Sequence, residues 1–481
     1  MMKRYIYFLI MVFLMNIESF SSCKDETSNP TMEVSTKTIS FQDDLDSLNF
    51  MLTTDCNWNI TYDDATIPDW LSISKTKGVG GTSELKFKTI SLNTTGITRC
   101  AVVRISYNNG QARSVKVYQS PKIYPSYNTS PIAPDQSGME SGSATELISK
   151  IKFGINIGNT LELKNINIDP TEPYIKFIKR CGFNAVRIPC GWNQRADQKT
   201  AKISDEFMTK VKHIVKWCIE NDMYVLLNIH WDGGWLENNC TITKQDSVNA
   251  KQKAFWTQIA TGMRDFDDHL MFASTNEPNA NTEETMDVLL SYHQTFINAV
   301  RSTGGRNTYR TLVLQGDTKY INPSNFPTDP TPNRLAFEWH NYSPTSFTIL
   351  DNDPPVGWDY VRFYWGTGNH SKKEPKRNCT YGEEDELLSD SQSIKAQFID
   401  KGIPVIMGEY SAQRFNSNSK FVPKELDKHN KSVDDWITFM TKQSLVVGIK
   451  PFYWETGSML DRVNNIVLDQ RSLNAILAEA Q

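Results

Sequence analysis

From residue 144 onward, short apolar runs alternate with longer segments in which apolar residues recur every three or four positions. The runs predict eight buried strands, at 153–159, 183–188, 223–230, 270–276, 310–314, 334–340, 403–409 and 450–454. The longer segments predict helices at 171–181, 204–221, 249–263, 284–303, 386–401, 433–447 and 471–480. Alternating strands and helices favour a parallel sheet, and this α/β pattern over 144–481 fits a (β/α)8 TIM barrel.

The segment 34–120 has a different pattern, in which apolar and polar residues alternate over short runs such as 101–107 and 114–119. Glycine and asparagine at 78–81 and 108–110 supply turns between the runs. This pattern predicts a small all-β sandwich. The following segment, 121–143, is rich in Pro, Ser and Gly without periodicity, which predicts a semi-rigid linker.

Two of the predicted barrel strands end in glutamate, at Glu277 and at Glu409. A glutamate after an apolar run is often only the first solvated residue of a loop. Other strand ends, however, carry Arg187, His230 and His340. The carboxyl ends of barrel strands meet at one face, where such folds place their chemistry. Two glutamates on different strand tips are the arrangement that cleavage of a glycosidic bond requires.

An ordered set of motifs covers residues 150–456. It comprises Gly-Asn-Thr-Leu-Glu at 158–162, Val-Arg-Ile-Pro at 186–189, Asn-Ile-His-Trp-Asp-Gly-Gly-Trp at 228–235, Asn-Glu-Pro at 276–278, His340 with Tyr342, Gly-Glu-Tyr at 408–410, and Trp454. The set resembles glycoside hydrolase family 5, and within it the endo-β-1,4-glucanases that include xyloglucanases. One departure is Trp339-His340-Asn341, where relatives commonly have Val-His-Tyr.

The resemblance implies a retaining mechanism, with Glu277 as acid/base and Glu409 as nucleophile about 5–5.5 Å apart. Arg187 would hold Glu409 ionised, whereas Glu277 would need a less solvated and less cationic setting to keep its proton near neutral pH. Asn276 would hydrogen-bond the sugar 2-hydroxyl. The substrate-binding candidates are Asn156, Arg187, Trp231, Trp235, His230, Asn276, His340, Tyr342 and Trp454.

Five tryptophans in predicted loops indicate an open, aromatic-lined groove for a polymer, although each could equally be a packing residue. They are Trp192, Trp231, Trp235, Trp358 and Trp365. Glu338 precedes His340 by two residues and so shares its side of the strand, where it could support the site. The spacing of His230, Asp232 and His340 matches no metal motif, and we expect neither a metal nor a cofactor.

The β-rich segment also carries motifs. Cys56-Asn57-Trp58, Trp70-Leu71-Ser72, the glycine turn, Arg99 and Val117-Tyr118-Gln119 occur in an order that resembles a BACON domain, an immunoglobulin-like family. Trp58 and Trp70 could stack on sugars, but tryptophans of sandwiches are more often in the core. A spacer role is therefore favoured over carbohydrate binding.

The N-terminus predicts a lipoprotein signal peptide at residues 1–22, with a basic start, an apolar stretch at 5–17 and small residues before Cys23. This arrangement resembles a lipobox, which implies acylation of Cys23. Lys24-Asp25-Glu26 resembles the tag that directs such proteins to the outer face of a double-membrane bacterium. The alternative is a soluble secreted protein in which Cys23 is incidental.

With a net charge of −4, the chain has no basic field for nucleic acid. The expected partner is a β-1,4-linked glucan polysaccharide, with membrane contact only through lipid on Cys23, and we expect a monomer. The other seven cysteines show no disulfide or zinc spacing. Two alternatives are a β-mannanase of the same family and a non-catalytic glycan-binding lipoprotein, which would have no use for Glu277 and Glu409.

Overall fold

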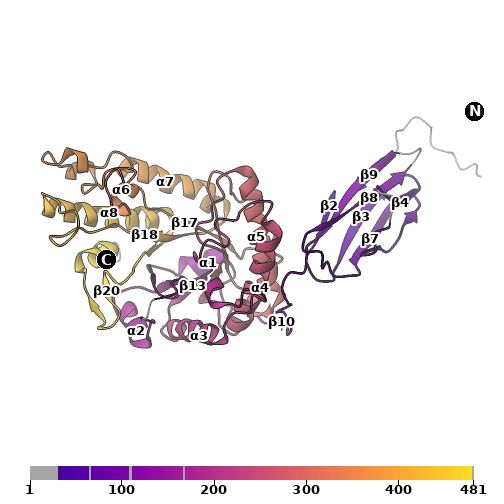
Figure 1. Cartoon of the computed structure of the whole chain (residues 1–481), viewed down its shortest axis with the longest axis horizontal. Coiled ribbons are helices and arrows are strands. Elements are labelled where there is room, and N and C mark those ends of the chain that lie inside the picture. Colours follow the sequence, from indigo (N-terminus) through magenta and orange to yellow (C-terminus); the bar gives the residue numbers. More distant parts are fainter. Residues whose placement is uncertain (1–30, 64–66, 108–110, 166–167, 479–481) are drawn as a thin grey trace, which may run out of the picture. The chain divides into compact units, whose positions relative to one another are not determined.

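The computed structural model of the 481-residue chain describes residues 31–63, 67–107, 111–165 and 168–478. The described residues form two compact units, one of 31–93 and 98–120 and the other of 94–97 and 121–478 (Figure 1). The predicted signal peptide and Cys23 lie outside the described residues. Within the described ranges, we find no helix with both the length and the apolar character needed to cross a bilayer.

The first unit is a sandwich of two sheets, as predicted. One sheet has the strand order β1-β3-β7-β5 and the other β2-β9-β8-β4-β6. The strands are β1 (Met32–Val34), β2 (Thr38–Phe41), β3 (Ser47–Thr54), β4 (Trp58–Tyr62), β5 (Leu71–Ile73), β6 (Lys77–Gly78), β7 (Gly81–Thr89), β8 (Arg99–Tyr107) and β9 (Gln111–Gln119).

Residues along the strands of this unit alternate between buried and exposed positions, as a half-buried strand requires. In β7, Leu85 and Phe87 are fully buried while their neighbours are exposed. Trp58 and Trp70 belong to the same core, with exposed fractions of 3% and 6%, so neither is a surface platform for sugars. The guanidinium of Arg99 lies 4.8 Å from the Trp70 ring centroid, and its Nε donates to Gln119. The core position of both tryptophans favours the spacer interpretation.

The second unit contains a closed barrel of eight parallel strands, each at a predicted position. In barrel order they are β11 (Gly154–Asn156), β12 (Ala185–Ile188), β13 (Tyr224–Asn228), β14 (Leu270–Ala273), β16 (Leu312–Gln315), β17 (Leu335–His340), β18 (Val405–Tyr410) and β19 (Lys450–Tyr453). These strands are buried on both faces, which is why the sequence shows them as continuous apolar runs.

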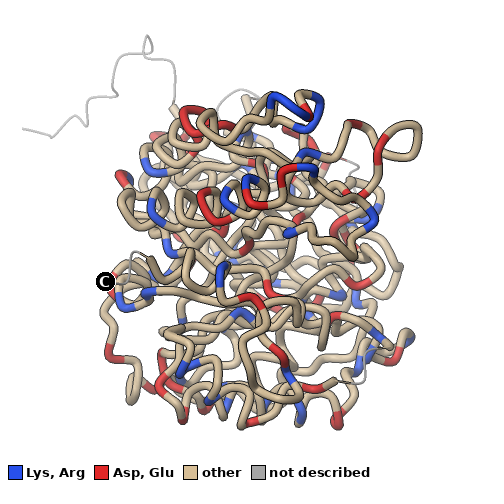
Figure 2. The backbone as a smooth tube through the Cα atoms, turned by 90° about the vertical axis from the view of Figure 1, so that its left-hand side faces the viewer, with Lys and Arg blue, Asp and Glu red and all other residues tan. Residues whose placement is uncertain are grey.

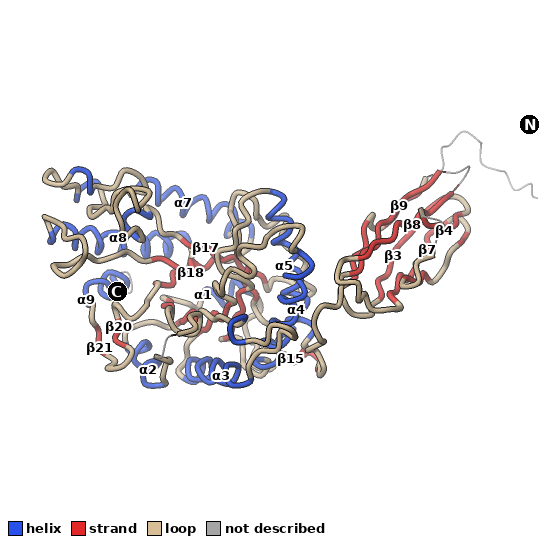
Figure 3. The backbone as a smooth tube through the Cα atoms, viewed as in Figure 1, coloured by secondary structure: helices blue, strands red, loops and turns tan. Residues whose placement is uncertain are grey.

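All seven predicted helices are present and flank the strands (Figure 3). They are α2 (Glu172–Arg180), α3 (Asp205–Glu220), α4 (Gln245–Met263), α5 (Glu283–Ser302), α7 (Glu384–Gln397), α8 (Leu426–Val447) and α9 (Gln470–Leu477). Two short helices were not predicted, α1 (Ala144–Ser149) and α6 (Thr345–Thr348). The connection from β16 to β17, residues 316–334, consists of turns and irregular backbone.

The smaller elements lie in the connections. They are the 3₁₀ turns η1 (Asn193–Arg195), η2 (Arg306–Thr308), η3 (Thr367–Asn369), η4 (Pro375–Arg377) and η5 (Ile399–Lys401), the short pair β10 (Ile132–Pro134) and β15 (Gly304–Gly305), and the hairpin β20 (Leu460–Asp461) and β21 (Ile466–Val467).

The barrel interior changes from apolar to polar along the strands. Near the strand starts, residues such as Leu226, Met271 and Phe452 form one cluster with Leu147 and Ile148 of α1. Further along five of the strands, β11, β12, β13, β16 and β17, the inward position is polar. These positions hold Asn156, Arg187, Asn228, Gln315 and Glu338, all of them buried. The apolar layer therefore supports a layer of buried polar groups towards the carboxyl ends of the barrel strands.

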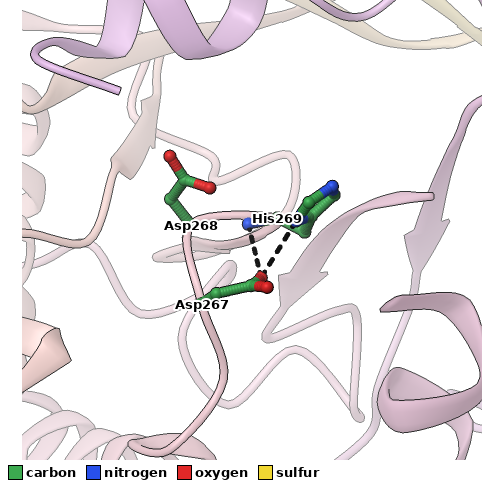
Figure 4. A group of neighbouring side chains, drawn as sticks. All are labelled: Asp267, Asp268 and His269. Carbon is green, nitrogen blue, oxygen red and sulfur yellow. Dashed lines mark hydrogen bonds and ion pairs between the residues drawn. The ribbon is translucent and has the colours of Figure 1, made fainter. Parts of the chain in front are cut away.

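The segment 121–143, predicted as a linker, belongs to the barrel unit. Its strand β10 pairs in parallel with β15, and the hydroxyl of Tyr127 donates to the carbonyl of Thr200 at 2.7 Å. The backbone N–H of Ser141 donates to Asp268 at 2.8 Å. The next residue of that turn, His269, donates from its backbone to Asp267 at 3.0 Å (Figure 4). The segment is thus fastened to the barrel by its own hydrogen bonds.

Acidic and basic residues are interspersed along the tube of the backbone (Figure 2), which agrees with the net charge of −4.

Candidate active site

Polar side chains from four barrel strands converge at the ends of those strands. Arg187 lies on β12, Glu277 follows β14, His340 ends β17 and Glu409 lies on β18. One carboxylate oxygen of Glu277, one of Glu409 and one ring nitrogen of His340 all lie within 4.8 Å of one another. That proximity matches the short carboxyl separation of retaining glycosidases, since inverting enzymes need roughly 6.5–9.5 Å to admit a water.

Arg187 is fully buried beneath the two glutamates and binds four groups. Its Nη1 donates to Glu409 at 2.7 Å and to Asn156 at 2.9 Å, its Nη2 donates to Asn276 at 2.6 Å, and its Nε lies 2.7 Å from Glu338. Burial alone would lower the pKa of Arg187, but the charges of Glu338 and Glu409 reverse the shift and raise it. The guanidinium is therefore a fixed positive charge that orients side chains from β11, β17 and β18 and from the turn after β14.

His340 lies between two carboxylates. Its Nδ1 is 2.8 Å from Glu277 and its Nε2 is 3.0 Å from Glu338. Burial opposes the charged imidazole, yet Glu409, Glu277 and Glu338 outweigh burial and raise the pKa of His340 to about 10. Both ring nitrogens of His340 accordingly carry protons at neutral pH and donate to the carboxylates.

The setting of Glu277 differs from the sequence-based expectation. We predicted a weakly cationic environment that keeps this carboxyl protonated, and that prediction is wrong. Burial does raise the pKa of Glu277, but the hydrogen bond from His340 and the charges of His340 and Arg187 lower it further than burial raises it. The proton shared by the two groups therefore resides on His340.

Glu409 has a partner for each oxygen. Oε1 accepts from Arg187, and Oε2 accepts from the Tyr342 hydroxyl at 2.9 Å. Burial and the charge of Glu409 raise the pKa of Tyr342, which keeps its proton available for this bond. The carboxylate is thus held in one orientation.

Asn276 also has a fixed orientation. Arg187 can only donate hydrogen bonds, so the atom of Asn276 that it contacts is Oδ1. The Nδ2 group of Asn276 is therefore left to donate toward the groove that this residue lines.

His230 and Trp454 form an aromatic wall beside the carboxylates, with nearly parallel rings 5.6 Å apart. Burial lowers the pKa of His230 to about 3, which keeps the ring neutral. The Asn228 amide lies 3.2 Å from Nδ1 of His230 and, as an N–H donor, makes Nδ1 the acceptor. Nε2 of His230 therefore carries the proton and can donate to a bound hydroxyl group.

These groups form part of the lining of an open groove of about 1070 Å³. Trp231, with an exposed fraction of 45%, Trp454 and Tyr342 lie on its walls. The exposed residues Ile349 and Leu468 also line it, which adds apolar surface to an otherwise polar site. Aromatic, apolar and carboxylate side chains thus line the same groove.

Comparison with known proteins agrees with this geometry. The family model for cellulase, glycosyl hydrolase family 5, matches residues 151–459, and that for the viral BACON domain matches residues 31–121. A xyloglucan-specific endo-beta-1,4-glucanase of Bacteroides ovatus is 31% identical, over 99% of this chain and 96% of that protein. The chain belongs to glycosyl hydrolase family 5. The predicted family, enzyme class and BACON resemblance are therefore confirmed.

Solved family 5 structures give the same result. A Bacteroides ovatus xyloglucanase in complex with a XXXG heptasaccharide has a TM-score of 0.66 and 29% identity, and the match covers 93% of this chain and 99% of that one. A xyloglucan-specific beta-1,4-glucanase from a ruminal metagenomic library, in complex with XXLG, has a TM-score of 0.62 and 32% identity, over 70% of this chain and 95% of that one.

Four of the predicted substrate-binding residues lie outside the groove lining: Arg187 and His340, described above, and Asn156 and Trp235. Asn156 is fully buried, and its amide donates to the carbonyl of Gly408 at 2.8 Å while its oxygen accepts from Arg187. Trp235 packs edge-on against Phe255, with ring centroids 5.4 Å apart, and lies outside the groove lining. Asn156 therefore positions Arg187, and Trp235 is a packing residue.

The tryptophans also divide between groove and core. Trp192 and Trp365 were candidates for the groove, but their exposed fractions are 0% and 2%. Each indole N–H donates to a backbone carbonyl, that of Asn228 and that of Gly382 respectively. Trp358 is 65% exposed on the loop after α6. Only some of the predicted platforms are thus available to a polysaccharide.

Three residues of the site were not predicted as part of it. Gln315 accepts from the backbone N–H of Glu277 at 2.5 Å, Asn228 fixes His230, and Gly408 leaves space for Glu338. The inward alternation along the strands could have pointed to Asn228 and Gln315, because each lies two residues after an apolar inward position. Glu338 itself was predicted as a supporting residue, and its contacts with Arg187 and His340 agree.

Two groups of acidic and imidazole side chains in the described part of the chain are close enough together to be considered for a metal ion. In the group Glu277, His340 and Glu409, the imidazolium form of His340 has no lone pair to offer a metal. In the group Asp267, Asp268 and His269, Asp267 already accepts a hydrogen bond from the backbone of His269 (Figure 4), and Asp268 accepts one from the backbone of Ser141. Both groups are accounted for by internal hydrogen bonds.

Proposed function

We propose that this family 5 hydrolase is a retaining endo-β-1,4-glucanase that cuts within the backbone of xyloglucan and related plant β-glucans. The observation that carries the proposal is the placement of Glu277 and Glu409 oxygens within 4.8 Å of each other on the wall of an open groove. A retaining mechanism requires this short separation, and internal cutting of a chain requires a groove that is open along its length.

In the first step, Glu409 attacks the anomeric carbon while the leaving oxygen takes a proton from Glu277. Oε2 of Glu409 is the attacking oxygen because Oε1 is bound to the buried guanidinium of Arg187. Glu277 receives the proton that it delivers from Nδ1 of His340, at 2.8 Å. Substrate in the groove removes water from Glu277 and so favours its neutral form, which promotes this transfer.

In the second step, a water molecule enters on the side of the departed sugar, and Glu277 takes a proton from it as the water attacks the glycosyl–enzyme bond. His340 returns to its charged form as the proton moves back across the same hydrogen bond. Glu409 is released as a carboxylate, and the product has the same anomeric configuration as the substrate. The proton taken from the water replaces the one that His340 gave up in the first step, so the cycle closes.

The groove supports a branched or unbranched glucan as the substrate. Trp454 provides an aromatic face beside the catalytic carboxylates, and Trp231 provides another that is 45% exposed. Two relatives, described above, carry names that specify xyloglucan. We therefore place xyloglucan first among β-1,4-glucans, ahead of mixed-linkage glucan and carboxymethylcellulose.

The test is a panel of soluble polysaccharides with viscometry, reducing-end assay and product sizing. We expect the viscosity of xyloglucan to fall quickly while reducing ends rise slowly, as internal cutting requires. Galactomannan should be poorer by about an order of magnitude or more in kcat/KM, because groups that hydrogen-bond an equatorial 2-hydroxyl lose their partner when the hydroxyl is axial.

Three outcomes would contradict parts of the proposal. Rapid hydrolysis of galactomannan with little action on any glucan would replace the glucanase with a mannanase. Release of a single small product from chain ends would replace internal cutting with exo action. Binding of glucans without any product would make the protein a glycan-binding lipoprotein.

A further inference from the structure

The backbone of Glu277 has a left-handed conformation, with φ of +48°. A residue other than glycine rarely adopts this conformation, because its Cβ approaches its own carbonyl oxygen. Glu277 also precedes Pro278, whose ring restricts the backbone of the residue before it. A strained conformation of this kind persists only where surrounding contacts impose it.

One contact from another strand is placed to impose it. Oε1 of Gln315, at the end of β16, accepts from the backbone N–H of Glu277 at 2.5 Å. Gln315 is buried, with an exposed fraction of 6%, so water does not compete strongly for this bond. The side chain of Gln315 therefore determines where the backbone N–H of Glu277 can point.

Gln315 is itself held by the helix α5. Nε2 of His293 lies 2.9 Å from the carbonyl of Gln315, and Nδ1 of His293 lies 2.6 Å from the hydroxyl of Ser274. Burial lowers the pKa of His293 to about 4, so its neutral ring donates from Nε2 to the carbonyl and accepts at Nδ1 from the hydroxyl. Ser274 lies three residues before Glu277, which closes a loop of contacts around the turn.

We propose that Gln315 is a positioning residue that holds Glu277 in its left-handed conformation and thereby aims its carboxyl at the leaving oxygen. The inference rests on the proposed function, in which Glu277 is the acid. Gln315 touches neither reacting atom, and it acts only through the direction of the Glu277 side chain.

This role has a kinetic signature that general destabilisation lacks. A sugar hydroxyl is a poor leaving group and needs a proton from Glu277, whereas 2,4-dinitrophenolate leaves without one. In kcat/KM, which reports steps up to the formation of the glycosyl–enzyme, a misdirected acid slows cleavage of an oligosaccharide far more than cleavage of an activated aryl glycoside. The ratio of kcat/KM for the oligosaccharide to kcat/KM for the aryl glycoside is also independent of the fraction of protein that is folded.

The experiment compares cellotetraose or a xyloglucan oligosaccharide with 2,4-dinitrophenyl β-cellobioside. Gln315→Leu should lower kcat/KM for the oligosaccharide by about 100-fold, the scale of a misplaced reacting group. It should change kcat/KM for the aryl glycoside by less than about 3-fold, because that substrate does not use the acid. Gln315→Glu keeps an acceptor oxygen and should restore the ratio to within about 5-fold of the wild-type value.

Gln397→Leu is the matched control. Gln397, on α7, donates to the carbonyls of Thr318 at 2.7 Å and Ile321 at 2.9 Å, in the same loop that follows Gln315. Its loss disturbs that loop without touching Glu277, so the ratio should stay at the wild-type value. A ratio that falls as much in Gln397→Leu as in Gln315→Leu would assign the effect to the loop as a whole.

The remaining outcomes also decide the question. If Gln315→Leu lowers kcat/KM equally for both substrates, or lowers it for neither, the positioning role is overturned. The role is also overturned if the kcat/KM ratio of Gln315→Glu is as low as that of Gln315→Leu. Failure of the proposed function is distinguishable from all of these, because it would appear as a wild-type protein that hydrolyses neither substrate.

Discussion

Gly408 and Glu338 face each other inside the barrel so closely that a Cβ atom on residue 408 would lie 2.0 Å from Oε1 of Glu338. That oxygen is the one that contacts Nε of Arg187 at 2.7 Å and Nε2 of His340 at 3.0 Å. The glycine before Glu409, the proposed nucleophile, is therefore needed for space. It makes room for the carboxylate that keeps Arg187 and His340 charged.

Gly408→Ala should accordingly displace Glu338 and weaken both contacts. We expect a loss of about 1–3 kcal/mol in the free energy of unfolding, as for overpacked cores, together with a clear loss of kcat. Urea unfolding and steady-state kinetics measure the two effects. Gly368→Ala is the control, since a Cβ there meets no atom within 4 Å. Equal behaviour of the two variants would contradict the spatial argument.

The strand positions could be predicted because barrel strands are buried on both faces and so appear as uninterrupted apolar runs. The catalytic candidates Glu277 and Glu409 followed from the ends of those runs. The burial of Trp192 and Trp365 could not be predicted, because the carbonyls that accept hydrogen bonds from their indole N–H groups, on Asn228 and Gly382, come from other parts of the chain. Loop burial depends on such distant contacts and leaves no local periodicity.

The protonation states of the site residues also could not be predicted from the sequence. The proton of Glu277 depends on the charge of His340, and that charge depends on Glu338 and Glu409. These four residues come from β17, β18 and the turn after β14, so only the folded barrel brings their charges together. The supporting role of Asn156 could have been predicted, because its inward position on a strand already indicated a partner across the barrel.

Glu409→Ala and Glu277→Ala should each lower turnover by several orders of magnitude while the barrel remains folded, because each removes a bond-making or proton-transfer group. Azide should restore activity to Glu409→Ala by taking the place of the nucleophile and should give a product of inverted configuration. Circular dichroism checks folding, and NMR of the azide product checks configuration. Near-wild-type turnover in either variant would remove that residue from the mechanism.

His340 should make the stability of the barrel depend on pH. Its pKa is raised from 6.5 to about 10 in the folded protein, so its stabilising contribution is complete below the unfolded pKa of 6.5 and is lost as pH rises through about 10. The difference in free energy of unfolding between wild type and His340→Asn should therefore shrink from pH 6.5 to 10. Urea titrations at a series of pH values measure it. A difference that stays constant across this window would show that His340 is not charged in the folded protein.

We propose that Cys23 carries a lipid that anchors the protein at the cell surface, on the basis of the sequence around it. Cys23→Ala should release or mislocalise the protein while kcat stays unchanged, because every residue of the proposed mechanism lies after residue 144, about 120 residues further along the chain. Membrane fractionation and mass spectrometry of the mature N-terminus measure the two parts. A wild-type N-terminus without lipid would leave a soluble secreted enzyme.

Trp231 and Trp192 should respond in opposite ways to replacement by alanine, although both follow predicted strands. Trp231 is 45% exposed on the groove wall, so Trp231→Ala should weaken polysaccharide binding by about 0.5–1.5 kcal/mol per lost stacking contact and leave the unfolding midpoint unchanged. Trp192 is fully buried, packs edge-on against Phe207 at 5.2 Å and donates to Asn228, so Trp192→Ala should cost about 3–5 kcal/mol of stability. Affinity electrophoresis in xyloglucan and urea unfolding measure the two effects. A stable Trp192→Ala protein with weakened binding would place that tryptophan in the groove after all.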